Sequence, residues 1–154
     1  MKRAAVVLLV ILAVPLLGSV PAAATSVGLG VGFDPTGLLL FSALTEVSVF
    51  EFVDLRAEAG FAVQENIEGL MLATGTVIAH YSVDPVDPFF GVGIGVAMTP
   101  PPFSTGLVLE AVAGLRILPV DAVEFSLHVR YLLRYTEGIW TTGPVYEGAL
   151  LLRF

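Results

Sequence analysis

The stretch that decides the fold spans residues 123–135 and reads Val123-Glu124-Phe125-Ser126-Leu127-His128-Val129-Arg130-Tyr131-Leu132-Leu133-Arg134-Tyr135. Its odd-numbered side chains are all aliphatic or aromatic, and its even-numbered ones are polar or charged except at Leu132. Successive side chains of a β-strand point to opposite faces, so this alternation predicts a strand with one apolar and one polar face.

The same period of two recurs along the chain. We expect further strands at about 27–33, 42–50, 55–64, 70–83, 91–98, 107–118 and 144–154, with turn-forming segments between them. The segment 107–118 is compatible with a helix as well, and its prediction as a strand rests on its hairpin-like neighbours. Residues 84–88, which contain two prolines, are expected to lie outside any strand. A loop over residues 136–143 is expected to carry Trp140, the one tryptophan.

The composition is too hydrophobic and too poorly charged for an ordinary water-soluble domain. Of the 154 residues 56% are hydrophobic and 14% charged, with a formal net charge of −7, whereas soluble domains have about 25% charged residues. These values argue against a soluble enzyme, a disordered chain and a nucleic-acid-binding protein, which needs a basic surface. Because cysteine is absent, disulfides, thiolate metal ligands, a cysteine nucleophile and a lipoprotein anchor are not expected.

The first 24 residues have the pattern of a cleaved secretory signal peptide. Lys2 and Arg3 form a positive start, residues 4–17 form an apolar run, and Ala22-Ala23-Ala24 offers the small residues that a signal peptidase recognises. The run is shorter than the roughly 20 residues of a membrane-spanning helix. We therefore predict cleavage after Ala24 and export of residues 25–154, a single domain with five arginines, no lysine and fourteen acidic residues.

The exported part has no later apolar run of a length that would make a membrane helix. Only helices and closed barrels satisfy the backbone within lipid. The sequence therefore predicts an all-β protein, an eight-stranded antiparallel up-and-down transmembrane β-barrel with short connections. An even number of strands places both termini on one side, which we expect to be the periplasm.

The polar faces of the predicted strands carry the ionisable residues that we assign to the barrel interior. They are Glu46, Arg56, Glu58, Glu110, Arg116, Glu124, His128, Arg130, Arg134, Glu147 and Arg153.

Buried charges persist only when they are paired, so we expect five Glu–Arg pairs in a charge-neutral network. The interior of eight strands is just wide enough for side chains, and the network should therefore close the lumen. The other nine acids are expected in the connections, at Asp34, Glu51, Asp54, Glu65, Glu68, Asp84, Asp87, Asp121 and Glu137. Glycines at 28–32 and 91–95 would make room for long side chains.

The C-terminal sequence Tyr146-x-Gly148-x-Leu150-x-Leu152-x-Phe154 resembles the last strand of bacterial outer-membrane β-barrel proteins. The stretch Pro88-Phe89-Phe90-Gly91-Val92-Gly93-Ile94-Gly95 is similar to a strand of the small eight-stranded members, the OmpA-, OmpX- and OmpW-like barrels. The resemblance implies an outer-membrane location, contact with outer-membrane lipid, a monomer, and recognition of residues 146–154 by the barrel-assembly machinery. The connections are shorter than in such proteins, which argues against an adhesin or a receptor.

One short motif points to chemistry. His80-Tyr81-Ser82 resembles the His-x-Ser element of outer-membrane lipid A deacylases, eight-stranded barrels with a Ser–His–Glu triad. Residues 83–109 lack the corresponding Glu, and the motif falls at the predicted periplasmic end of its strand. His128, beside Ser126 and Arg130, is interpreted as a hydrogen-bonding partner in the lumen. No cofactor, metal ion or nucleic acid is predicted.

Six aromatic residues are candidates for the girdles that barrels place at the two membrane interfaces. They are Tyr81, Tyr131, Tyr135, Trp140, Tyr146 and Phe154.

Three functions remain open from the sequence. The first is a structural or passive outer-membrane barrel with at most minor passage of a solute or hydrophobe. The others are a soluble periplasmic barrel that binds a small apolar ligand, and a hydrolase that resembles the lipid A deacylases.

Overall fold

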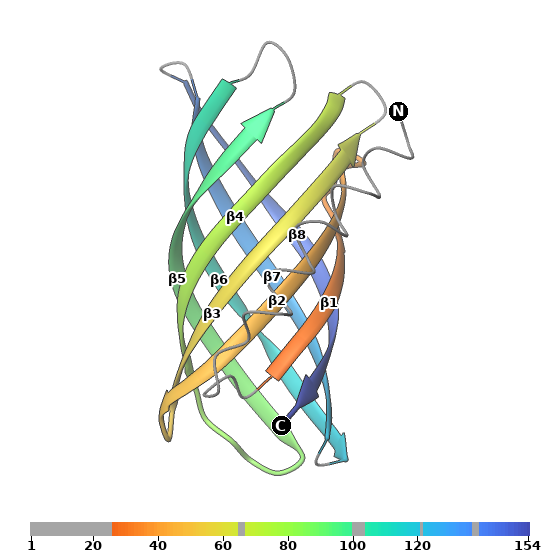
Figure 1. The fold of residues 1–154 in the computed structure, drawn as a ribbon, viewed down its shortest axis with the longest axis vertical. Helices are drawn as coiled ribbons and strands as arrows, with labels where there is room; N and C mark the ends of the chain where they lie inside the picture. The colour runs from red at the N-terminus through yellow and green to blue at the C-terminus, as the bar shows by residue number, and fades with distance from the viewer. Residues whose placement is uncertain (1–25, 65–66, 100–103, 121, 137–138) are drawn as a thin grey trace.

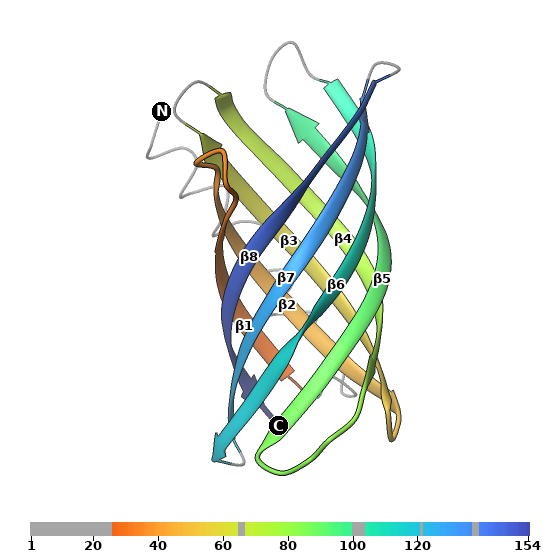
Figure 2. The same ribbon diagram turned by 180° about the vertical axis from the view of Figure 1, so that it is seen from behind.

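The computed structural model describes residues 26–64, 67–99, 104–120, 122–136 and 139–154 as a single closed β-barrel. The predicted signal peptide, residues 1–24, lies outside the described residues. Each strand is antiparallel to its neighbours and follows them in sequence order around the barrel (Figures 1 and 2). The eight strands are β1 Ser26–Phe33, β2 Leu39–Phe50, β3 Val53–Gln64, β4 Ile67–His80, β5 Val86–Thr99, β6 Ser104–Val120, β7 Val123–Thr136 and β8 Ile139–Arg153.

The barrel closes where the first strand pairs with the last. The β1–β8 ladder extends from Ser26 opposite Arg153 to Phe33 opposite Tyr146. The C-terminus therefore lies at the same end as the start of β1, together with the β2–β3, β4–β5 and β6–β7 connections (Figure 1). We call this the terminal end and the opposite one the loop end. The predicted up-and-down topology is confirmed, and residues 107–118 lie in β6.

Several strand boundaries differ from the expected ones: β2, β4 and β6 each begin three residues earlier, and β4 ends at His80 and not at residue 83. The differences at β5 and β8 overturn two further expectations. β5 begins at Val86, so Asp87 and Pro88 belong to the strand. Pro88 is tolerated because its carbonyl points toward the β4 side and accepts a hydrogen bond from Tyr81 N at 3.0 Å, one residue beyond the last residue of β4. β4 has already ended at this level, so the N–H that proline lacks is not needed for a hydrogen bond within the β4–β5 ladder. β8 begins at Ile139, so the backbone of Trp140 lies in a strand, opposite Tyr135, and not in a loop.

The two faces of the barrel wall differ in chemistry. Residues such as Leu127, Val92 and Leu29 point outward and are 60%, 66% and 62% exposed, whereas Arg130, Ile78 and Leu151 point inward and are at most 1% exposed. At the strand positions whose side chains the structure describes, the outward positions of this alternation carry no Asp, Glu, Lys or Arg. Among the described residues there is also no helix long and apolar enough to cross a membrane.

Glycines on the inner face make room for the larger side chains of the lumen. A Cβ on Gly93 would lie 2.6 Å from Thr76 Oγ1, 2.7 Å from the backbone oxygen of Gly75 and 2.8 Å from Glu110 Oε1. Gly75, on the outer face of β4, has no atom within 4 Å of such a Cβ. Substituting each glycine therefore distinguishes two effects. A change at Gly93 tests the space available in the lumen, and a change at Gly75 tests the general cost of glycine in a strand.

We predict that Gly93→Ala destabilises the barrel by about 1–3 kcal/mol, because the added methyl overpacks the interior. Gly75→Ala, in the neighbouring strand, is the matched control and should be neutral or slightly stabilising, because alanine has less backbone freedom to lose. Urea unfolding of both variants in lipid vesicles measures the difference. Equal effects of the two substitutions would contradict the close packing of the lumen.

Candidate functional site: the charged interior

Two networks of buried ionisable side chains fill the terminal end and the middle of the lumen. The Arg116 network comprises Arg56, Arg116, Glu46, Asp54, His80, Asp87 and Glu124. The Arg130 network comprises Arg130, Glu58, Glu110, Glu147, His128, Ser42 and Thr76. The members of both networks are inward-facing residues of the strands. Residues from several strands meet at the same height along the barrel axis.

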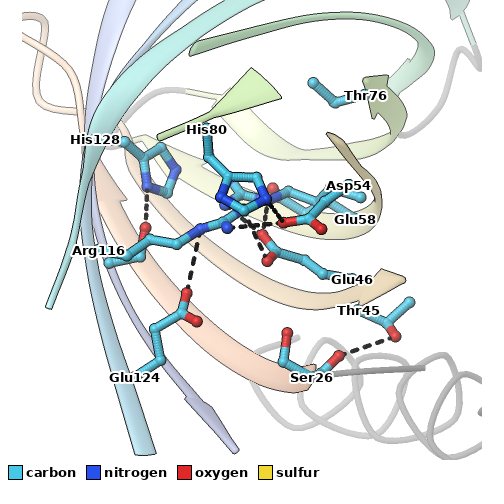
Figure 3. A network of polar contacts seen from close by, with 12 residues as sticks. Ser26, Thr45, Glu46, Asp54, Glu58, Thr76, His80, Arg116, Glu124 and His128 are labelled. Atoms are coloured by element: carbon cyan, nitrogen blue, oxygen red, sulfur yellow. Dashed lines mark hydrogen bonds and ion pairs between the residues drawn. The ribbon is translucent and has the colours of Figure 1, made fainter. Parts of the chain in front are cut away.

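Arg116 on β6 is the centre of the first network. Its Nη1 lies 2.8 Å from Asp54 Oδ2 and 3.3 Å from Asp87 Oδ2, and its Nη2 lies 3.0 Å from Glu46 Oε2. Its Nε points the other way, 3.4 Å from Glu124 Oε1. Figure 3 shows this guanidinium between Glu124 on one side and Glu46 and Asp54 on the other. One arginine thus contacts carboxylates from four strands.

Phe89 lies close to both arginines of this network. Its ring centroid is 5.2 Å from Cζ of Arg56 and 5.0 Å from Cζ of Arg116. A cation near an aromatic face is stabilised by the negative potential of the ring. Arg56 also contacts Glu46 Oε1 at 2.6 Å, so the two guanidiniums share one carboxylate and one ring.

Arg130 on β7 organises the middle of the lumen and is 1% exposed. Its Nη2 contacts Glu58 Oε2 and lies 3.4 Å from Glu147 Oε2, and its Nε lies 3.5 Å from Glu110 Oε2. Hydroxyl groups contact two of these carboxylates as well: Ser42 donates a hydrogen bond to Glu147 at 2.5 Å, and Thr76 donates one to Glu110.

His128 is hydrogen-bonded within this network. Its Nε2 lies 3.5 Å from Glu147 Oε2 and its Nδ1 lies 3.2 Å from Ser126 Oγ. The structure thus places His128 as a partner of lumen side chains.

The balance of charge in the lumen differs from the expected one. Seven carboxyl side chains are buried among the described residues, against the three guanidinium groups of Arg56, Arg116 and Arg130. Two of these acids, Asp54 and Asp87, were expected in connections, and this expectation was wrong because each occupies an inward position at a strand end. Arg134 is only half-buried and Arg153 is exposed, so the interior is acidic and not neutral.

The predicted lumen residues therefore fall into three groups. Nine are buried in the two networks: Glu46, Arg56, Glu58, Glu110, Arg116, Glu124, His128, Arg130 and Glu147. Arg134 lines a cavity at the loop end, and Arg153 lines a small one of about 60 Å³ at the terminal end. Sequence reasoning missed Asp54, Asp87, His80, Ser42, Thr76 and Phe89 as lumen residues. A signal was available for two of them, because Ser42 shares the parity of Glu46 and Asp54 that of Arg56 on the same strand.

His80 and Ser82 do not form a catalytic triad. A serine hydrolase needs one imidazole nitrogen on the serine and the other on a carboxylate. Here His80 Nδ1 lies 3.1 Å from Asp87 Oδ2, and its Nε2 lies 3.6 Å from Asp54 Oδ2. Both nitrogens thus face carboxylates, while Ser82 is exposed beyond the end of β4. In the described part of the chain, no three His, Asp or Glu side chains are arranged to hold a metal ion.

The residues of the predicted assembly signal alternate outward along β8. Tyr146, Leu150 and Leu152 are 42%, 46% and 52% exposed, and Phe154 beyond the strand is 83% exposed. Gly148 lies between them on the same face and is half-buried.

Exposed aromatic side chains occur at both ends of the barrel. At the terminal end these are Phe50, Phe52, Tyr81 and Phe154. Near the loop end Phe33 and Tyr146 pack with ring centroids 5.6 Å apart, and Tyr131 and Tyr135 are exposed on β7. The side chain of Trp140 lies outside the described side chains.

The Arg130 network generates a stability prediction. Arg130→Met should cost about 3–5 kcal/mol of unfolding free energy, because it leaves several buried carboxylates without a cation. Glu58→Gln removes one carboxylate from the same network and should cost less, since carboxylates exceed guanidiniums in the lumen. Urea unfolding followed by tryptophan fluorescence and gel mobility compares them. Equal costs for the two substitutions would contradict an acid excess.

Comparison with known proteins identifies the architecture. No protein-family model matches the chain, and no curated protein resembles it in sequence. The N-terminal β-barrel domain of Pseudomonas aeruginosa OprF superposes with a TM-score of 0.71 at 10% identity, covering 86% of this chain and 98% of that one. Neisserial surface protein A gives a TM-score of 0.67 at 11% identity, covering 85% and 95%. The outer membrane enzyme PagL gives 0.57 at 14% identity, covering 84% and 98%.

These identities are too low to carry a function from one protein to another, but the superpositions span most of each chain. The same barrel thus occurs in proteins of different activity, including an enzyme, so the function must be argued from the residues of this chain. The chain has the fold of the small eight-stranded outer-membrane β-barrels.

Proposed function

We propose that this chain is an integral protein of the bacterial outer membrane with a structural or passive role. The observation that carries the proposal is the inversion of the barrel wall: charged side chains lie inside, and the outward strand positions described carry none. A barrel in water would need the reverse arrangement, whereas lipid favours an apolar exterior around a polar interior.

The structure also supports a closed lumen. Arg130, Ser126, Ile78 and Leu151 are at most 1% exposed, so side chains fill the lumen from its terminal end as far as Arg130. The cavities at Arg134 and Arg153 lie at opposite ends. The Arg116 network lines the cavity at Arg153, and the Arg130 network lies between the two cavities. Free passage of a solute through the lumen is therefore not part of the proposed function.

Location and assembly follow as parts of the same proposal. We infer that the signal peptide is cleaved after Ala24, that both termini face the periplasm, and that the barrel is a monomer in contact with outer-membrane lipid. The outward apolar residues of β8 would be read by the barrel-assembly machinery. A hydrolase is the weaker alternative, because neither nitrogen of His80 is directed to a serine, and the serine that contacts His128, Ser126, is fully buried in the lumen.

The decisive test places a charge on the outer surface. In lipid vesicles, Leu127→Arg should reduce the free energy of folding by about 2–4 kcal/mol, the cost of a charge facing the middle of a bilayer. Leu127→Ala is the control for the lost side chain, and heat-modifiable gel mobility measures the folded fraction. If the mature protein is a soluble periplasmic barrel, Leu127→Arg will instead leave folding intact and the protein will stay monomeric without detergent.

The closed lumen makes a second prediction. The mature protein in planar bilayers should show no large, long-lived conductance, because the buried side chains of the Arg130 network fill the lumen. The double variant Arg130→Ala with Glu58→Ala removes a contacting pair and should raise the conductance, while Arg153→Ala at the exposed terminal end should not. A large conductance in the unaltered protein would overturn the plugged interior.

A further inference from the structure

The loop end of the lumen is chemically unlike the rest. A cavity of about 220 Å³ lies there, which we call the Arg134 cavity. Its deeper wall is apolar and comes from five strands, through residues that include Ala62, Leu72, Ala97, Val108 and Val145. All five are buried, at 1–5% exposure. The charged networks do not contribute to its lining, so its interior is an apolar chamber above a charged plug.

The rim of the cavity is polar and reaches the surface. Thr36, Thr141 and Thr142 line it and are exposed. Arg134 also lines it, and the Cα atom of Arg134 pairs with those of Val108 on one side and Thr141 on the other. Arg134 therefore lies at the boundary between the apolar wall and the polar rim of the cavity.

Arg134 lacks the carboxylates that hold the other lumen arginines. Its Nε is buried without a hydrogen-bond partner, and among the described residues it forms no ion pair within 4 Å. The one acid in the cavity lining, Asp34, is engaged in the β1–β2 turn, where it accepts hydrogen bonds from Thr36 N at 2.8 Å and from Leu38 N at 2.9 Å. Burial alone would raise the pKa of Asp34, but the hydrogen bonds from Leu38 and Thr36 outweigh it and hold that pKa below its ordinary value.

We propose that the Arg134 cavity binds a small amphiphile with a single apolar tail and one anionic head group. The tail packs against Leu72, Ala97 and Val108, and the guanidinium of Arg134 donates hydrogen bonds to the head group. Small-molecule sites usually measure about 300–1,000 Å³. A volume below that range selects a short chain, such as a medium-chain carboxylate, and excludes a two-chain lipid. This inference goes beyond the structural role and stands on different residues.

The test is methyl NMR of the mature protein in phosphatidylcholine nanodiscs, titrated with octanoate. We expect saturable shifts at the cavity methyls of Leu72, Val108 and Val145. The lipid-facing methyls of Leu127 and Leu150 report simple partitioning into the bilayer. Shifts of both sets to the same extent, without saturation, would overturn the proposal.

Variants separate the two halves of the site. Arg134→Gln should weaken octanoate binding by about tenfold or more, the loss of a hydrogen bond to a charged group, and should leave the binding of neutral octanol unchanged. Arg153→Gln, the same charge change at the other end of the barrel, is the matched control. Ala97→Leu fills the apolar wall and should abolish the binding of both compounds. If Arg134→Gln and Arg153→Gln behave alike, the anion site is refuted.

Two further controls keep the outcomes distinct. Nanodiscs with added phosphatidylglycerol, without octanoate, show whether an anionic lipid enters the cavity: unchanged cavity methyls are expected, and shifts there would refute the small ligand proposed. Heat-modifiable mobility of each variant reports the folded barrel. A folded, membrane-inserted barrel with no octanoate site would refute this inference alone, whereas a failure to insert would refute the proposed function.

Discussion

The confinement of charge to a narrow lumen is the constraint on which the rest of this structure depends. An isolated charge in a low-dielectric interior is costly, so each buried guanidinium must meet carboxylates at close range. Arg116 and Arg130 do so by contacting residues from several strands each, which ties distant parts of the wall together. The inward glycines follow from the same constraint. Gly93 leaves the space that Glu110 occupies, and Gly30 leaves the space that Glu147 occupies.

The outer surface obeys the complementary rule. The described ionisable side chains lie in the lumen or at the ends of the barrel. The outward positions therefore carry aliphatic and aromatic side chains such as Leu127 and Phe90. The unusually hydrophobic composition is thus a property of the surface more than of a core. The apolar clusters inside the barrel are small, and the one around Leu72, Ala97 and Val108 gives the loop end its separate chemistry.

Much of this architecture could be predicted from the alternation of apolar and polar residues along the sequence. The alternation of residues 123–135 identifies the inner and outer faces of β7, and the alternation within each strand assigns nine of the buried ionisable residues correctly. Asp54 and Asp87 were misassigned because each lies beside turn-forming residues, where a strand end and a loop look alike. For Asp54, its parity with Arg56 was the available signal. It was not predictable that Arg134 forms no ion pair among the described residues, because pairing depends on the register between strands, which alternation within one strand does not determine.

The pairing of β1 with β8 has a consequence for how such a chain comes into being. Every backbone edge is satisfied only when the segment that ends at Arg153 has met the segment that starts at Ser26. A sheet that lacks either of these strands has two open edges, where the closed barrel has none. The ring is therefore complete only when its first and last strands are both in place, however stable the hairpins between them are.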